Sequence, residues 1–213
     1  NKSTVYLLHD LTEIIETLEK NEEITYYLFD AQTSLIDDYL RYRPEMETRL
    51  RKLISEKRLL TGPWYTQTDQ MIIHGESIVR NLLYGMKEAE DYGYCFKVGH
   101  AVDCFGQGNQ MPQIYAGVGI PFTFFKRGID FNKIPKTEFI WKSDDGSFVK
   151  AYHAIDYMNF RNPDASYEKN LETVKKIEEK YLPRSASKEM FLFNGFDQHP
   201  IRKDIVKLMK DLQ

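Results

Sequence analysis

The chain lacks the features that mark several classes of protein. Its 213 residues include two cysteines, Cys95 and Cys104, too few for a disulfide framework and at a spacing that matches no zinc ribbon. We therefore expect a reducing, cytoplasmic setting. No apolar run approaches the roughly 20 residues of a membrane helix, and the first residues do not form a signal peptide. The net charge of −3 provides no basic field for nucleic acid or anionic lipid.

Motifs for several kinds of catalysis are also missing. No two of the five histidines, His9, His74, His100, His153 and His199, stand three to five residues apart. This spacing excludes the HExxH zincins and argues against metal-dependent carbohydrate deacetylases, which use an HxxxH pair. The sequence has no P-loop, no complete dinucleotide-binding glycine pattern and no Gly-x-Ser-x-Gly. Nucleotide binding and serine nucleophiles therefore have no support.

The chain does contain alternating helical and strand patterns. Apolar residues from Leu7 to Leu18 follow one helical stripe, and another helix is predicted from Gly75 to about Gly93. Further helices are predicted to begin near Pro44, Pro112 and Pro200 and to cover 171–177, and strands are predicted at 24–30, 59–65, 96–102, 121–126, 139–141, 148–152 and 190–193. This alternation predicts an α/β fold with a mostly parallel sheet, which either closes as a barrel or winds both ways.

Carboxylates at predicted strand ends are the candidates for chemistry. Asp103 directly follows the strand 96–102, Asp197 lies four residues beyond the strand 190–193, and Asp30 ends the strand 24–30. The carboxyl ends of parallel strands carry the sites of α/β enzymes. Two such carboxylates are what glycosidases use, but an aspartate after a strand is also a common helix N-cap. The spacing alone leaves both interpretations open.

Five blocks of sequence carry a more specific signal. They are VDCFGQGNQMPQI from Val102, GPWYTQTD from Gly62, GESIVRNL from Gly75, KTEFIW from Lys136 and NGFDQHP from Asn194. In order and spacing they resemble glycoside hydrolase family 38, the α-mannosidases, most closely its bacterial mannosylglycerate hydrolase branch. The resemblance covers nearly the whole chain.

This resemblance implies a catalytic domain of the seven-stranded β/α-barrel type, incomplete in this chain. Residues 1–213 would be a partial N-terminal catalytic domain, with the opening His-x-His-Trp-Asp zinc motif and the downstream domains outside it. The implied activity is retaining, zinc-dependent hydrolysis of α-mannosides such as mannosylglycerate or short α-mannosyl oligosaccharides. Asp103 corresponds to the nucleophile and a Zn²⁺ ligand, and Asp197 to the acid/base. We expect the other zinc ligands to lie outside this chain, and the fragment alone to bind zinc poorly and to be inactive.

Several residues are candidates for contacts with the substrate. By the resemblance, Arg127 matches an arginine near the nucleophile and Phe105 an aromatic residue of the sugar subsite. Asp69 and His153 are candidates for the lining of the cleft. His199 is either a neighbour of a helix N-cap or a substrate contact.

Two other functions stay open at this point. One is a barrel-type carbohydrate deacetylase, and the other is a catalytically inactive carbohydrate-binding domain. A retaining mannosidase predicts that the carboxyl groups of Asp103 and Asp197 lie about 5–6 Å apart. The sequence is compatible with a homo-oligomeric full-length form and does not define the glycosidic linkage or the aglycone.

Overall fold

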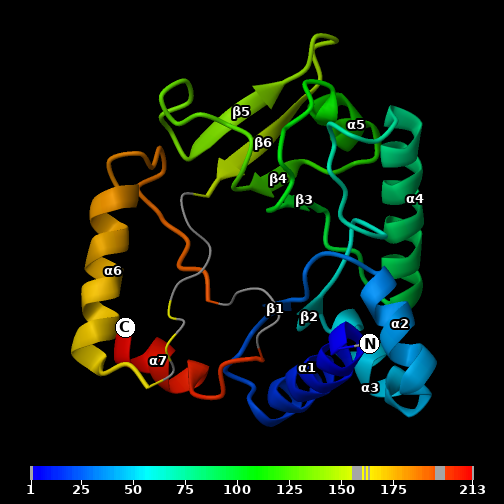
Figure 1. Ribbon diagram of the computed structural model, residues 1–213, viewed down its shortest axis with the longest axis vertical. Helices are drawn as coiled ribbons and strands as arrows, with labels where there is room; N and C mark the ends of the chain where they lie inside the picture. Colours follow the sequence, from blue (N-terminus) through cyan, green and yellow to red (C-terminus); the bar gives the residue numbers. More distant parts are fainter. Residues whose placement is uncertain (1, 155–159, 161, 163, 195–199, 213) are drawn as a thin grey trace.

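The computed structural model describes residues 2–154, 160, 162, 164–194 and 200–212. Helices and strands alternate along the chain, as predicted (Figure 1). The helices are α1 Lys2–Lys20, α2 Ser34–Tyr42, α3 Glu47–Ser55, α4 Gly75–Tyr92, α5 Met111–Gly117, α6 Tyr167–Tyr181 and α7 Ile205–Leu212, with the 3-10 helix η1 Pro44–Met46. The strands are β1 Tyr27–Leu28, β2 Leu59–Leu60, β3 Val98–Ala101, β4 Phe122–Phe125, β5 Glu138–Lys142 and β6 Phe148–His153.

The described strands form two sheets. β1 and β2 pair in parallel, and a four-stranded sheet has the order β3-β4-β6-β5. Within it β3, β4 and β6 are parallel, while β5 and β6 form the antiparallel hairpin predicted around Gly146. This is a mixed α/β fold. The described strands do not close into a barrel, so the seven-stranded barrel is not confirmed.

The two faces of the four-stranded sheet differ in what covers them. Alternate strand residues point to opposite faces. One face, which we call the helix-covered face, includes Gly99, Thr123 and Val149 and is covered by apolar side chains from α4 and α5. The approach is close, because a Cβ on Gly99 would lie 2.5 Å from Cζ of the buried Tyr115.

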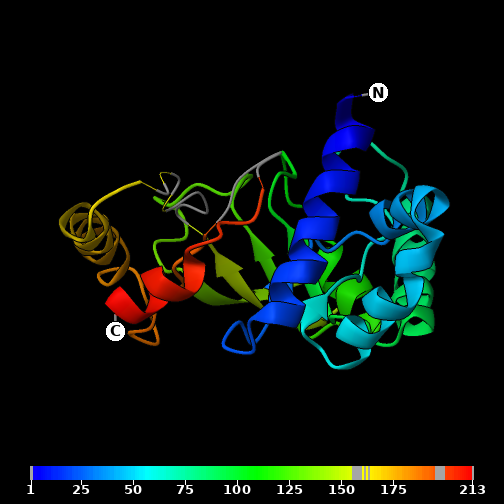
Figure 2. The ribbon, with the colours of Figure 1, turned by 90° about the horizontal axis from the view of Figure 1, so that it is seen from below.

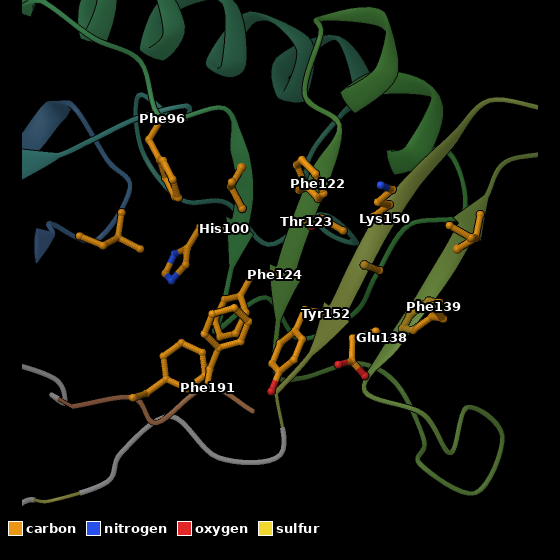
Figure 3. Close-up of a pocket in the computed structure, with 15 residues that line it drawn as sticks. Phe96, His100, Phe122, Thr123, Phe124, Glu138, Phe139, Lys150, Tyr152 and Phe191 are labelled. Carbon is orange, nitrogen blue, oxygen red and sulfur yellow. The ribbon is translucent and has the colours of Figure 1, made fainter. Parts of the chain in front are cut away.

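The opposite face, which we call the cavity face, carries His100, Phe122, Phe124, Lys150 and Tyr152 (Figure 3). It borders a cavity of about 660 Å³. Register places His100, Phe124 and Tyr152 side by side on three strands. Their rings stack in a row, with centroids 5.4 and 5.8 Å apart.

A second core lies beneath the N-terminal helices. The apolar stripe of α1 is confirmed, since Leu11, Ile14, Ile15 and Leu18 are all buried there. They pack with buried residues of α2, α3 and β2, and with the half-buried Tyr27 of β1. Both views place α6 and α7 on the other side of the molecule from α2, α3 and α4 (Figures 1 and 2).

Helix α4 fits closely against the segment that follows β2. A Cβ on Gly85 would lie 2.1 Å from the backbone carbonyl carbon of Trp64, so the helix approaches this backbone through a glycine. Asn81, one turn earlier, accepts hydrogen bonds from the backbone N–H groups of Tyr65 and Thr66 at 3.0 and 3.2 Å. Its Nδ2 donates to the carbonyl of Thr66 at 2.7 Å. The side chain of Asn81 thus replaces a strand partner for this segment.

Several predictions of secondary structure were wrong or incomplete. Helix α2 was not predicted, and β1 and β2 are shorter than the predicted strands 24–30 and 59–65. Residues 190–193 lie outside the strands, although Phe191 and Phe193 pack their rings on Tyr152 and Phe124. Among the described residues, no helix is long and apolar enough to cross a membrane.

Candidate active site

The fold brings Asp103 and Arg127 together at the ends of two neighbouring strands. Ala101 and Phe125, the last residues of β3 and β4, are partners in the parallel register. Asp103 and Arg127 each follow two residues later, so they emerge side by side. Nε of Arg127 donates to Oδ1 of Asp103 at 2.7 Å, and both side chains are about 40% exposed (39% and 43%). A guanidinium at this distance balances the carboxylate charge and fixes its orientation.

Phe105 completes this group, which we call the Asp103 cluster: Asp103, Phe105 and Arg127. The guanidinium carbon of Arg127 lies 4.9 Å from the centroid of the Phe105 ring, which is 71% exposed. Nε2 of Gln107 donates to the carbonyl of Arg127 at 3.1 Å and ties the two loops together. The structure therefore unites three residues that the sequence analysis selected.

Asp69 reaches the Asp103 cluster through Cys104. The sulfur of Cys104 lies 3.9 Å from Oδ1 of Asp69 and donates to the carbonyl of Gly106 at 2.9 Å. The backbone N–H of Gln70 donates to the same sulfur at 3.3 Å. Burial raises the pKa of the Cys104 thiol, so it stays protonated and holds the two loops in place.

His153 contacts the backbone of Lys126, the residue before Arg127. Its ring is fully buried and stacks on Phe131 with centroids 4.0 Å apart. Nε2 lies 2.9 Å from the carbonyl oxygen of Lys126. Burial lowers the pKa of His153, so a neutral imidazole donates to that carbonyl. In this position His153 supports the loop of Arg127, and its contact with substrate stays a prediction.

The remaining predicted site residues, Asp197 and His199, lie outside the described residues. The predicted separation of 5–6 Å between the carboxyl groups of Asp103 and Asp197 therefore stays a prediction.

The described residues do not form a zinc site by themselves. A catalytic zinc needs about three protein ligands. Within the described parts of the chain, no group of three His, Cys, Asp or Glu side chains is arranged to hold a metal ion. Asp103 would supply one ligand of such a site, and zinc binding stays a prediction.

The structure adds a polar network that the sequence analysis missed. It consists of Asp30, Gln32, Gln67 and His100, and we call it the Asp30 network. Nε2 of Gln67 lies 2.9 Å from the carbonyl oxygen of Asp30 and 3.3 Å from Nδ1 of His100. Only Asp30 had drawn attention, as the end of a strand. The sequence offered one further sign of this network, because Gln67 lies in the block GPWYTQTD that begins at Gly62.

The imidazole of His100 is held neutral. Burial lowers its pKa to about 4, although the negative charge of Asp103 acts in the opposite direction. The ring points into the cavity of Figure 3, between Phe96 and Phe191. A neutral, polar ring thus faces a largely aromatic cavity, close enough to Asp103 to sense its charge.

Comparison with known proteins identifies the family of this chain. Residues 2–213 match the family described as "Glycosyl hydrolases family 38 N-terminal domain". A protein of Halalkalibacterium halodurans named "Putative mannosylglycerate hydrolase" is 33% identical over 96% of this chain and 24% of its own length. "Alpha-mannosidase G" of Dictyostelium discoideum is 27% identical over 62% of this chain and 14% of its own length.

Solved structures show the same relationship. The crystal structure of an α-mannosidase from Enterococcus faecalis V583 superposes with a TM-score of 0.90 and 25% identity, over 98% of this chain and 24% of that one. The chain thus spans about a quarter of the length of this structure and of the mannosylglycerate hydrolase relative. The chain belongs to glycoside hydrolase family 38, within the N-terminal domain of that family.

Proposed function

We propose that this chain is the catalytic part of a retaining α-mannosidase, with Asp103 as the nucleophile. The observation that carries the proposal is the Asp103 cluster, in which a half-exposed carboxylate is oriented by Arg127 beside an exposed aromatic ring. Carboxylates at strand ends act as nucleophiles in retaining glycosidases, and aromatic faces suit the apolar face of a sugar. The names of the relatives support α-mannosides, mannosylglycerate included, as the substrate class.

The chemistry follows from two carboxyl groups. Asp103 attacks the anomeric carbon while the bond to the leaving oxygen breaks, and Asp197 gives that oxygen a proton. Water then attacks the same carbon, Asp197 takes its proton, and the carboxylate of Asp103 departs. Two displacements at one carbon return the original configuration. Arg127 keeps the carboxylate of Asp103 oriented through Oδ1 in both steps.

The proposal includes a Zn²⁺ ion for which Asp103 would be one ligand. The carboxylate is a suitable ligand type for Zn²⁺, and the remaining ligands would come from outside the described residues. When bound, the ion would add positive charge beside the nucleophile and offer a site for sugar hydroxyls. The cysteines are free and buried, which supports the reducing, cytoplasmic setting that we propose for the enzyme.

A trapping experiment on the full-length protein tests the role of Asp103. An α-mannosyl fluoride with a second fluorine on the sugar ring slows the hydrolysis of a covalent intermediate. Trypsin then releases residues 98–126, in which Asp103 is the sole carboxylic side chain, so the site of labelling is unambiguous. We expect mass spectrometry to find one fluoromannosyl group on this peptide. Labelling elsewhere would overturn the role of Asp103.

Product analysis tests the reaction itself. We expect ¹H NMR during hydrolysis of an aryl α-mannoside to show α-mannose first, because configuration is retained. Initial β-mannose would contradict a retaining mechanism. Release of acetate from an acetylated sugar, without any release of mannose, would favour a deacetylase.

The role of Asp197 can be tested by chemical rescue. An activated aryl mannoside needs little protonation to leave, so Asp197→Ala should form the intermediate but hydrolyse it slowly. Added azide needs no base and should speed turnover, giving a mannosyl azide of retained configuration. Asp103→Ala serves as the control, because without the nucleophile no mannosyl azide of retained configuration can form. If azide rescues neither variant, the acid/base is another carboxyl group.

A further inference from the structure

The hydrogen-bond donors and acceptors of the Asp30 network can be assigned one by one. The backbone N–H of Gln67 and the hydroxyl of Thr66 approach Oε1 of Gln32 at 2.6 and 3.1 Å. A backbone N–H can only donate, so this atom of Gln32 is the oxygen. Its Nε2 therefore donates to Oδ2 of Asp30 at 2.5 Å. Gln32 thereby fixes the carboxylate of Asp30.

The same reasoning fixes the side-chain amide of Gln67. One end of this amide lies 2.9 Å from the carbonyl oxygen of Asp30 and 3.2 Å from its Oδ1. Both of those atoms accept hydrogen bonds, so the end that faces them is Nε2, with two N–H groups. One is directed to Asp30. The other is available to Nδ1 of His100 at 3.3 Å.

This assignment determines the tautomer of His100. A ring nitrogen that accepts a hydrogen bond carries no proton, so Nδ1 presents its lone pair to Gln67. The proton of the neutral ring is then on Nε2. No hydrogen bond to Nε2 is found among the described residues.

The ring of His100 is also fixed mechanically. The indole Nε1 of Trp64 donates to the carbonyl of His100 at 2.8 Å and anchors the backbone there. The imidazole stacks on Phe124 with an interplanar angle of 15°. Figure 3 shows the ring directed into the cavity, on the strand that leads to Asp103 three residues later. The Nε2–H group is therefore a pre-oriented donor in mostly aromatic surroundings.

We propose that His100 donates a hydrogen bond from Nε2 to an oxygen of the glycoside held at Asp103, and that Gln67 and Asp30 position it for this. The inference deepens the proposed function and rests on it. A donor fixed in aromatic surroundings favours a ligand with an acceptor oxygen at that point, since an unsatisfied donor costs binding free energy. His100 is thus a specificity residue for a hydroxylated glycoside, positioned by Gln67.

Two substitutions separate the two nitrogens of His100. In His100→Gln, Nε2 of the amide replaces the donor Nε2 of the ring. In His100→Asn, the shorter amide can still meet Gln67 but no donor reaches the Nε2 position. We expect kcat/KM of the full-length protein to fall about 10- to 100-fold in His100→Asn, mostly through KM, and less than about 5-fold in His100→Gln. Equal losses in both variants would overturn the proposal.

Deoxy analogues identify the acceptor oxygen. Among monodeoxy aryl α-mannosides, we expect one to be a poor substrate for the wild type but to lose no further rate in His100→Asn, because the two changes remove the same hydrogen bond. A set in which the losses add for every analogue would show that His100 does not contact a sugar hydroxyl.

The tautomer can be measured without any turnover. Nitrogen-15 NMR of labelled protein distinguishes a protonated Nε2 from a protonated Nδ1. We expect the Nε2–H form at pH 6–8, and a mixture of tautomers in Gln67→Leu. An Nδ1–H form in the wild type would overturn the assignment.

These measurements distinguish the failure of this inference from the failure of the proposed function. If the wild type hydrolyses no α-mannoside, the proposed function fails. The hydrogen bond from His100 is then tested by calorimetry, through the affinity for methyl α-mannoside. Weaker binding by His100→Asn but not by His100→Gln would support the inference, and equal affinities of the two variants would overturn it.

Discussion

The two faces of the four-stranded sheet are built from neighbouring residues of the same strands, but they have different surroundings and different roles. On the helix-covered face, Gly99, Thr123 and Val149 are buried against α4 and α5, and the hydroxyl of Thr123 donates to the carbonyl of Gly99 at 2.6 Å. On the cavity face, His100 and Tyr152 border an open space. A step of one residue along a strand thus moves from a position that stabilises the fold to one that can meet a ligand.

The largest expected effect lies at the strand ends that carry the candidate active site. We expect Asp103→Asn to lower kcat/KM for an α-mannoside by about 10⁴-fold or more, because the amide is a poor nucleophile. The side chain is 43% exposed, so thermal unfolding should change little. A variant that keeps a tenth of the activity would remove Asp103 from the chemistry.

A smaller loss is expected at Arg127. Arg127→Met removes both the hydrogen bond to Asp103 and the contact with Phe105, and we expect a loss in kcat/KM of roughly 10²-fold. Arg127→Lys keeps the charge without the planar group and should lose about tenfold. Equal rates in the two variants would show that the positive charge alone contributes nothing and that the planar guanidinium of Arg127 is what matters.

On the helix-covered face, we expect substitutions to change the stability of the protein instead of its activity. In Gly99→Ala the new methyl group would lie 2.5 Å from the ring of Tyr115, which has no space to move. We expect a loss of about 1–3 kcal/mol in the free energy of unfolding, measured with urea.

Gly117→Ala is the matched control for this substitution. Gly117 ends α5 and has nothing within 4 Å of an added Cβ, so stability should stay the same or rise slightly. The comparison of the two faces fails if Gly99→Ala is as stable as Gly117→Ala.

Glu138 provides a further test of the comparison between the two faces, because it lines the cavity but contributes to the stability of the fold. Burial disfavours its charge, but hydrogen bonds from Ser187, Thr137, Ser185 and the backbone of Ala186 outweigh this and lower its pKa to about 2. The native carboxyl therefore holds its proton less tightly than the unfolded one, with a pKa near 4.5. Its contribution to stability is complete above about pH 4.5 and is lost as the pH falls toward 2.

We expect Glu138→Gln to lower the free energy of unfolding at pH 7 by about 1–2 kcal/mol. The difference from the wild type should shrink below pH 4, where the wild type loses the same contribution. Urea unfolding at pH 7 and pH 3 checks this. A difference that does not depend on pH would assign the loss to packing instead of charge.

The sequence singled out those residues of the candidate site that lie close to motifs, and their roles stay predictions. Asp103, Phe105 and Arg127 come together because two parallel strands end in register, which strand patterns and block order allow one to anticipate. The Asp30 network is different. Its members are joined by side-chain hydrogen bonds across 33 and 37 residues, and no periodicity marks such contacts.

The same limit explains the errors in secondary structure. Helix α1 was predicted because its stripe runs over many turns, and α4 because Gly75 and Gly93 bound a long pattern. Helix α2 has nine residues, with Ile36 and Tyr39 as its buried positions, so its apolar pattern is too short to detect. The lengths of β1 and β2 depend on where a partner strand ends, and local sequence does not contain that information.

The close fit of α4 has a consequence for protein engineering and for natural recombination. Gly85 and Asn81 are matched to the backbone of residues 64–66, which lies well before the helix in sequence. In a chimera of two homologues, a crossover between residues 66 and 81 would join a helix from one parent to a segment selected with the other. Crossovers before residue 62 or after residue 93 keep the matched pair together. We therefore expect residues 62–93 to be exchanged successfully as one block, and shuffled libraries to be depleted in junctions inside it.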